Sequence, residues 1–124
     1  MAVASSILNI CRYETLRHTR TLILRQSGYV VAEAVTDEQA IVFLEGSLAF
    51  DLVIMCHSLP EASTLLLAAK VKELHPKLPI LMVSQGFETT AAQVDSFVPG
   101  LESPTALLDM VGSLMMKRAQ RAGS

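Results

Sequence analysis

The stretch that decides the fold of this chain is Asp51-Leu-Val-Ile-Met-Cys-His-Ser-Leu-Pro60. Its apolar part, residues 52–55, is a short continuous run, which is typical of a strand buried on both faces of a parallel sheet. Cys56 follows this run where such a strand ends. The stretch therefore predicts a parallel α/β sheet, with a thiol at the carboxyl end of one buried strand.

On both sides of this strand, short apolar runs alternate with segments of helical periodicity. Besides residues 52–55, strands are expected at residues 6–10, 29–34, 79–83 and 96–98. Helices are expected at residues 13–26, 36–44 and 62–74, and a last helix begins with Ser103 as its N-cap and Pro104 at its first position. Five strands alternating with helices predict a doubly wound parallel sheet.

Local signals support several of these boundaries. Ser27-Gly28 stops the first helix, and Thr36-Asp-Glu-Gln39 has the pattern of a capping box that opens the second. Residues 86–95 have few large apolar side chains, so we expect a short or frayed fourth helix there. The whole chain, 1–124, is expected to form a single domain with its core at about residues 7–116 and a frayed tail at residues 119–124.

Composition and charge narrow the classes of function. A net charge of −2 gives no basic field to attract nucleic acid or an anionic membrane, so neither is expected as a direct partner. Polar residues interrupt every apolar stretch well before the ~18 residues of a membrane span. The start of the chain is a poor signal peptide because it lacks a basic region, which indicates a cytoplasmic location, and two cysteines do not suggest a disulfide scaffold.

Several short motifs stand in a fixed order along the chain: Ile7-Leu-Asn-Ile10, Gly28-Tyr29, Ala40, Asp51-Leu-Val-Ile-Met55 with Pro60, Leu74-His-Pro-Lys-Leu-Pro-Ile80, and Phe97-Val-Pro99 ahead of Ser103-Pro104. In residue type and spacing this series resembles response-regulator receiver domains, from about residue 7 to residue 116. The resemblance implies a CheY-like (flavodoxin-like) sheet in the order 2-1-3-4-5, and a role in signal transduction of the two-component, phosphorelay type.

The same resemblance implies a phosphorylation pocket that has lost most of the side chains that phosphorylation requires. Phosphoryl transfer to an aspartate needs carboxylates that hold Mg²⁺, a hydroxyl donor and a lysine. The acidic pair of the family falls on Cys11 and Arg12, and its phosphoacceptor falls on Cys56. Ser84 retains the hydroxyl, whereas Gly100 stands in place of the lysine. The resemblance is therefore to a degenerate pseudo-receiver, for which we expect no phosphorylation, no Mg²⁺, no other cofactor, no catalytic residue and no enzymatic activity.

The residues of this emptied pocket have alternative interpretations. The first and third strands are neighbours in the implied topology, so Cys11 and Cys56 could approach disulfide distance and form a redox switch, or they could be small buried side chains of the core. A zinc site of Cys11, Cys56 and His57 lacks a fourth ligand. Arg12 is either a solvated loop residue or a recruiter of an anion, and Ser84 is more simply explained as a cap of nearby backbone.

Two surfaces are candidates for protein contacts. In the family, signals leave through the face of the fourth helix, fifth strand and last helix, where Phe97 occupies the position of a switching aromatic; the alternative is a core phenylalanine that does not switch. The last helix carries more apolar residues than one buried stripe needs: Leu107, Val111 and Leu114 fit the core, leaving Leu108, Met110, Met115 and Met116. The basic residues of the first helix region are interpreted as a solvated face, with docking on an acidic partner as the alternative; they are Arg12, Arg17, His18, Arg20 and Arg25.

Two functional hypotheses result. The first is a receiver-like module that is not phosphorylated and acts through contacts with a protein partner or as a homodimer. The second is a ligand- or redox-sensing module that has reused the emptied pocket around Cys11 and Cys56, with Arg12, His57 and Ser84 as further lining.

Overall fold

A parallel sheet forms the centre of the computed structural model, which describes residues 5–46, 49–56, 61–84, 96–99 and 104–122. The strands stand in the order β2-β1-β3-β4-β5, and each neighbouring pair is parallel. Their bounds are β1 (Ser6–Ile10), β2 (Val30–Ala34), β3 (Leu52–Cys56), β4 (Ile80–Ser84) and β5 (Ser96–Pro99). This order is the one that the resemblance implies.

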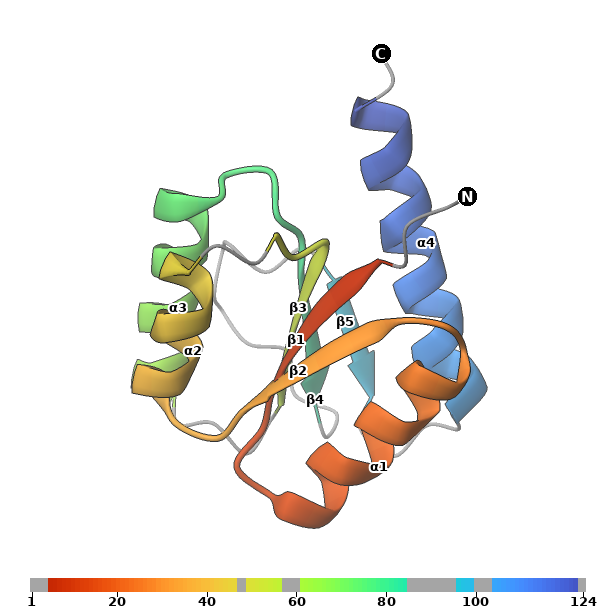
Figure 1. Cartoon of the computed structure of the whole chain (residues 1–124), viewed down its shortest axis with the longest axis horizontal. Coiled ribbons are helices and arrows are strands. Elements are labelled where there is room, and N and C mark those ends of the chain that lie inside the picture. Colours follow the sequence, from red (N-terminus) through yellow and green to blue (C-terminus); the bar gives the residue numbers. More distant parts are fainter. Residues whose placement is uncertain (1–4, 47–48, 57–60, 85–95, 100–103, 123–124) are drawn as a thin grey trace.

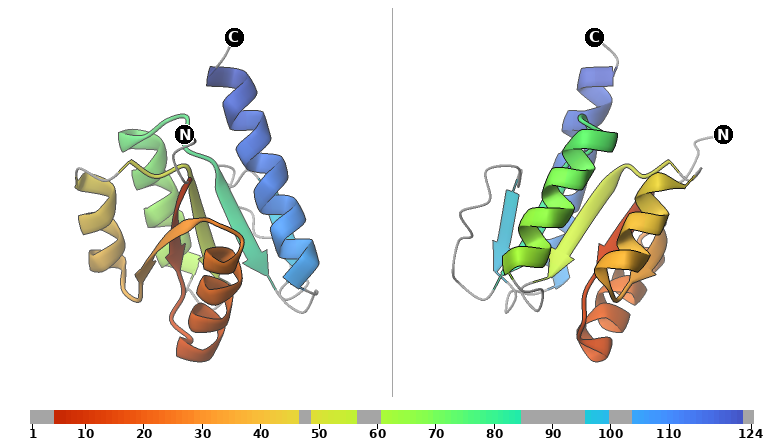
Figure 2. Two further views of the ribbon diagram at one scale, coloured as in Figure 1. Left: turned by 45° about the vertical axis from the view of Figure 1, so that its right-hand side comes forward. Right: turned by 90° about the vertical axis from the view of Figure 1, so that its left-hand side faces the viewer.

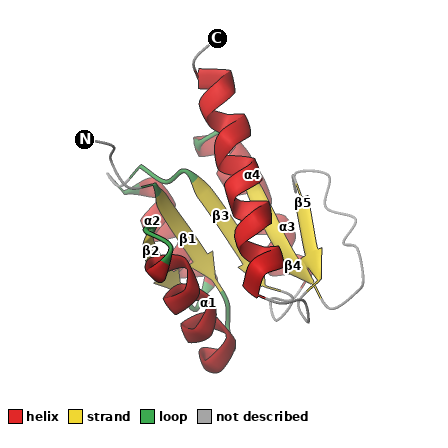
Figure 3. Ribbon diagram, turned by 90° about the vertical axis from the view of Figure 1, so that its right-hand side faces the viewer, coloured by secondary structure: helices red, strands yellow, loops and turns green. Residues whose placement is uncertain are grey.

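Helices cover both faces of the sheet (Figure 1). They are α1 (Glu14–Gln26), α2 (Asp37–Glu45), α3 (Glu61–Leu74) and α4 (Pro104–Ala122). The right-hand view of Figure 2 looks onto α2 and α3, and Figure 3 looks from the opposite side onto α1 and α4. The predicted doubly wound parallel α/β sheet is therefore confirmed. The short or frayed helix predicted at residues 86–95 lies outside the described residues, so α4 is the predicted last helix.

The local signals at two helix ends act as the sequence suggests. At the start of α2 the side chain of Thr36 accepts a hydrogen bond from the backbone N–H of Gln39, and Oε1 of Gln39 accepts one from the N–H of Val35. At the end of α1, Gly28 has a φ of 97°, a left-handed conformation that costs glycine little. The α2 boundary therefore follows from side-chain hydrogen bonds, and the α1 boundary from the backbone freedom of glycine.

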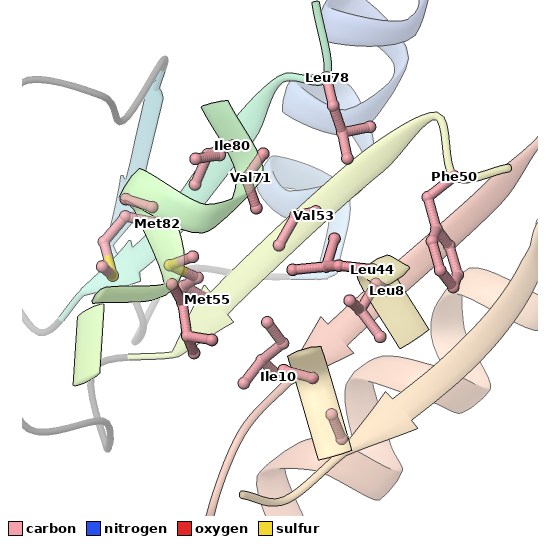
Figure 4. Close-up of a cluster of buried hydrophobic side chains, with 14 residues drawn as sticks. Leu8, Ile10, Leu44, Phe50, Val53, Met55, Val71, Leu78, Ile80 and Met82 are labelled. Carbon is pink, nitrogen blue, oxygen red and sulfur yellow. The ribbon is translucent and has the colours of Figure 1, made fainter. Parts of the chain in front are cut away.

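Two apolar clusters fill the spaces between the sheet and its helices. Residues of β1 and β3 alternate between them because successive strand residues point to opposite faces. Figure 4 shows the cluster under α2 and α3, to which Leu8, Ile10, Val53 and Met55 belong. The second cluster lies under α1 and α4 and contains Ile7, Leu24, Leu52, Ile54, Leu81, Leu107, Val111 and Leu114. Residues 52–55 of β3 are buried, as the opening stretch predicts, and the strand continues through Cys56, which is buried as well.

The last helix is longer than the sequence suggested. Its core face is the predicted one, with Leu107, Val111 and Leu114 buried. The helix continues through Ala122, whereas fraying was expected from residue 119. Good helix formers fill residues 117–122 and the next glycine is Gly123, so nothing in this segment stops the helix earlier. Its last turns project beyond the sheet in Figures 1 and 3. Within the described residues, no helix combines the length and apolarity needed to cross a membrane.

A candidate site at the carboxyl edge of the sheet

Cys11 and Cys56 lie at the same edge of the sheet, at the carboxyl ends of the neighbouring strands β1 and β3. The register pairs Ile10 with Met55, and each cysteine is the next residue along its strand. Both side chains are fully buried, on the α1 side of the sheet, and no disulfide joins them. The sequence prediction that the two cysteines approach one another at this edge is thus consistent with the register.

A buried arginine joins the two sulfurs. Arg20, in the middle of α1, is only 6% exposed. Its Nη1 donates to Sγ of Cys56 at 3.0 Å and lies 4.0 Å from Sγ of Cys11. No carboxylate among the described residues lies within ion-pair distance of this guanidinium. The polar contacts that the structure gives Arg20 are therefore to sulfur, and the shorter one is to Cys56.

The two cysteines have different hydrogen-bonding roles. Sγ of Cys11 donates to the backbone carbonyl of Tyr13 at 3.6 Å, which requires a proton on this sulfur. The backbone of Cys11 is also fixed, because its N–H donates to the carbonyl of Ala34 and its carbonyl accepts from Nη1 of Arg17 at 3.2 Å. Both sulfurs accept from Nη1 of Arg20, and the contact with Cys56 is 1.0 Å shorter than the contact with Cys11. Cys11 is thus a donor as well as an acceptor, and Cys56 is the sulfur closer to the guanidinium.

Arg12 has a carboxylate partner. Its Nη2 lies 3.6 Å from Oδ1 of Asp37, in the first turn of α2, and Oδ2 of Asp37 accepts from the hydroxyl of Ser63 on α3. The Arg12 side chain is 43% exposed. The cation that follows β1 therefore tethers the β1–α1 connection to the helices of the other face. This pairing offsets the positive charge that the anion-recruiting interpretation requires.

A second polar network fixes α1 against β1 and β2. Asn9, buried in β1, donates to Oγ1 of Thr21, and Glu33 accepts from Nε of Arg17 at 2.9 Å. Burial alone raises the pKa of Glu33, but the hydrogen bonds from Arg17 and Thr21 and the charges of Arg17 and Arg25 outweigh burial, so this pKa lies below its ordinary value. The network orients the helix that carries Arg20.

The interpretation of the first helix as a solvated basic face was wrong for Arg20, which is buried, and for Arg17, which is half-buried in its ion pair. A signal for Arg20 was present in the sequence, since Arg20 stands four residues from both Leu16 and Leu24 and shares their stripe of the helix. Sequence reasoning also missed Asp37, whose only visible role was as a residue of the capping box.

Several predicted site residues are not placed in detail. Ser84 ends β4 and pairs with Pro99 in the register, but its side chain is not described, and neither is that of Phe97. Gly100 and His57 lie outside the described residues. Within the part of the chain that the structure describes, no group of three or more His, Cys, Asp or Glu side chains is arranged to hold a metal ion. The functional groups that the structure places together at this edge are the two cysteine sulfurs and the guanidinium of Arg20.

The predicted contact residues of the last helix divide into two kinds. Leu108, Met110 and Met115 are half-buried and pack against the α1–α4 cluster. Met116 is 65% exposed. The surplus of apolar residues is thus partly absorbed by the core, and Met116 is the one of these four that α4 presents most fully to solvent.

The strand order and the helices on both faces (Figure 1) define a doubly wound α/β fold. No protein-family model matches the sequence, and no curated protein does. Solved structures do match: a CheY-like response regulator receiver domain protein from Methanospirillum hungatei JF-1 is 20% identical, with a TM-score of 0.86 over 96% of this chain and 99% of that one. The N-terminal domain of a response regulator/sensory box/GGDEF 3-domain protein from Carboxydothermus hydrogenoformans is 18% identical, with a TM-score of 0.83 over 95% and 99%.

The chemotaxis protein CheY4 of Vibrio cholerae is also similar, at 18% identity and a TM-score of 0.80 over 90% of this chain and 99% of that one. These likenesses establish the receiver fold for nearly the whole chain. In this chain, buried thiols and an arginine from α1 lie at the carboxyl ends of β1 and β3.

Proposed function

We propose that this chain is a non-catalytic, receiver-like module of two-component signalling that is not phosphorylated and acts through protein contacts. The observation that carries the proposal is the contact between Arg20 and Cys56. A receiver of the usual kind needs a carboxylate nucleophile at the end of β3 and further carboxylates for Mg²⁺. Here the end of β3 is a buried cysteine whose sulfur accepts a hydrogen bond from a cation of the domain itself.

The local charge also opposes binding of a metal ion. Mg²⁺ prefers oxygen ligands and keeps several water molecules, so it needs an open site with carboxylates. Arg20 is buried beside both sulfurs, and Arg12 engages Asp37, the carboxylate that α2 brings near this edge. A divalent cation placed there would meet two guanidinium groups. A resident Mg²⁺ is therefore not part of the proposed function.

Thermal unfolding in the presence of Mg²⁺ tests this part of the proposal, because a ligand that binds only the folded state raises Tm. We expect Tm of the wild type to be the same in Mg²⁺ as in an equal ionic strength of Na⁺. Mg²⁺ should likewise leave Tm of the Arg12→Gln variant unchanged. This control shows that Mg²⁺ is not merely repelled by the exposed charge of Arg12. A Mg²⁺-specific rise in Tm that disappears in the Cys56→Ala variant would overturn the proposal that the metal site is lost.

The proposed output surface is the face of α4, with Met116 at its exposed position and Leu108 and Met115 at its half-buried margin. Methionine side chains are flexible and polarizable, and they suit surfaces that adapt to a partner. The last turns of α4 project beyond the sheet, where a partner can reach them (Figure 3). A protein partner or a second copy of the chain would use this face together with β5.

Analytical ultracentrifugation separates the two kinds of partner. If this face forms a homodimer, Met116→Glu should shift the chain towards monomer, because a buried charge without a partner is unfavourable. The matched control is Val42→Glu, since Val42 on α2 is similarly exposed, at 69%, on the other side of the sheet. Equal association of wild type and both variants would exclude self-association through this face and leave a different protein as the partner.

A further inference from the structure

We propose that Arg20, Cys56 and Cys11 form a redox site that takes small hydroperoxides, with Cys56 as the reacting thiolate and Cys11 as the thiol that resolves it into a Cys11–Cys56 disulfide. This inference is independent of the protein-contact function proposed above, because it concerns the input at the carboxyl edge. It rests on three observations: a buried cation, the unequal roles of the two sulfurs, and the register of β1 and β3.

The buried cation is the first observation. Arginine stays protonated in proteins, and a buried guanidinium is unfavourable unless an anion compensates its charge. Arg20 is 6% exposed, and no carboxylate of the described residues lies within ion-pair distance of its guanidinium. The nearest group that can supply the compensating negative charge is Sγ of Cys56, 3.0 Å away. An adjacent guanidinium favours the thiolate over the thiol. The pair is then a buried ion pair of Arg20 and Cys56.

The second observation is the division of roles. Cys11 lies 1.0 Å farther than Cys56 from the same nitrogen of Arg20 and donates its own proton to the carbonyl of Tyr13. A peroxide-reactive site uses one thiolate as nucleophile and one neighbouring thiol that attacks the oxidised sulfur. The structure supplies one sulfur of each kind.

The third observation is the register. Cys11 and Cys56 follow a paired position of neighbouring parallel strands, whose spacing of about 4.8 Å falls inside the Cα separation of roughly 4.4–6.8 Å that disulfides span. Both sulfurs face the same side of the sheet, because one nitrogen of Arg20 contacts both. Their complete burial selects a small oxidant, such as hydrogen peroxide, over a bulky disulfide.

The chemistry balances as follows. The thiolate of Cys56 attacks one oxygen of the peroxide, an S–O bond forms, the O–O bond breaks, and the leaving hydroxide takes a proton from solvent to become water. Cys56 is then a sulfenic acid. The thiol of Cys11 attacks this sulfur, an S–S bond forms, the S–O bond breaks, and the hydroxyl group leaves as water with the proton of Cys11. Two electrons pass from the two sulfurs to the peroxide, and oxidation removes the anion beside Arg20.

Mass spectrometry of the full chain after brief treatment with hydrogen peroxide tests the site. The wild type should lose the mass of two hydrogen atoms, yield one peptide pair linking Cys11 to Cys56, and recover both thiols with dithiothreitol. In Cys11→Ser, the intact mass should rise by one oxygen atom, and a quench that unfolds the protein in the presence of dimedone should trap the sulfenic acid at Cys56, whereas in Cys56→Ser the same peroxide dose should leave Cys11 unmodified. Two reactive thiols after treatment of the wild type, or a crosslink between two chains, would overturn the proposal.

The role of Arg20 has its own controls. Arg20→Met should slow formation of the disulfide by at least about tenfold, because it removes the charge that favours the thiolate, and Arg20→Lys should retain most of the rate. Arg25→Met changes an exposed arginine of the same helix and should leave the rate unchanged. Circular dichroism verifies that each variant is folded. If a variant is unfolded, the mass-spectrometric result for the wild type still tests the proposal. Oxidation of folded Arg20→Met at the wild-type rate would refute the assignment of the thiolate.

Discussion

Nη1 of Arg20, in the middle of α1, lies 3.0 Å from Sγ of Cys56, the last residue of β3. This relationship joins a helix to the strand end at which, by resemblance, a receiver carries its phosphoacceptor. The remainder of α1 supports it, since Arg17 binds Glu33 and the carbonyl of Cys11, and Thr21 accepts from Asn9. A polar connection within the domain thus occupies the carboxyl edge of the sheet.

The hydroxyl of Thr21 provides a test of how firmly α1 is held. Its Oγ1 accepts from Nδ2 of buried Asn9 and helps to lower the pKa of Glu33. Thr21→Val keeps the shape but leaves these groups with one partner fewer, so we expect it to lower the free energy of unfolding by about 2 kcal/mol. Urea denaturation measures the change. Thr19→Val, at an exposed position of the same helix, should have little effect, and equal effects of the two variants would contradict the network.

The ion pair of Glu33 predicts a dependence of stability on pH. The pKa of Glu33 is lower in the folded protein than its ordinary value of 4.5. The ionised carboxylate therefore contributes fully to the free energy of unfolding above pH 4.5, and this contribution is lost as the pH falls through the lowered pKa of the folded state. Glu33→Gln should therefore cost about 1 kcal/mol at neutral pH, and the difference from wild type should shrink below pH 4.5. Denaturation at a series of pH values measures this difference, with Glu73→Gln at an exposed position of α3 as control for the lost charge. A difference independent of pH would be inconsistent with the ion pair.

The packing of α3 is tested by two adjacent leucines. Leu67 is fully buried in the cluster under α2 and α3, whereas Leu66 is 51% exposed. Leu67→Ala should lower the free energy of unfolding by about 3 kcal/mol through lost burial and the cavity it leaves, and Leu66→Ala should lower it far less. The comparison is made by chemical denaturation. A larger cost for Leu66→Ala would mean that α3 presents its other face to the sheet.

The N-cap of α2, Thr36, allows a further test, in which the expected change in the free energy of unfolding is smaller. Thr36→Ala removes the acceptor for the N–H of Gln39 and should cost about 1 kcal/mol of stability. Thr36→Ser keeps the hydroxyl and should retain most of that stability. The two variants are compared by thermal unfolding, and a Thr36→Ser variant as unstable as Thr36→Ala would show that the hydroxyl is not the stabilising group.

The fold was predictable from the sequence because its signals are local: the continuous apolar run of β3, Gly28 after α1 and the capping residues before α2 each act over a few positions. The positions of Cys11 and Cys56 at one edge followed from topology. The contact of Arg20 did not, because it joins residues 36 positions apart, and a charged residue was assigned by default to solvent. The pairing of Arg12 with Asp37 was missed for the same reason, since it depends on how the β1–α1 loop meets the first turn of α2.

The central claim is that the end of β3 no longer accepts a phosphoryl group. Intact-mass measurement after incubation with acetyl phosphate and Mg²⁺ tests this most directly, with a phosphorylatable receiver treated in parallel as control for the reagent. We predict that the mass of the wild type stays unchanged while the control gains a phosphoryl group. A phosphoryl adduct on the wild type that is absent from the Cys56→Ala variant would contradict the account.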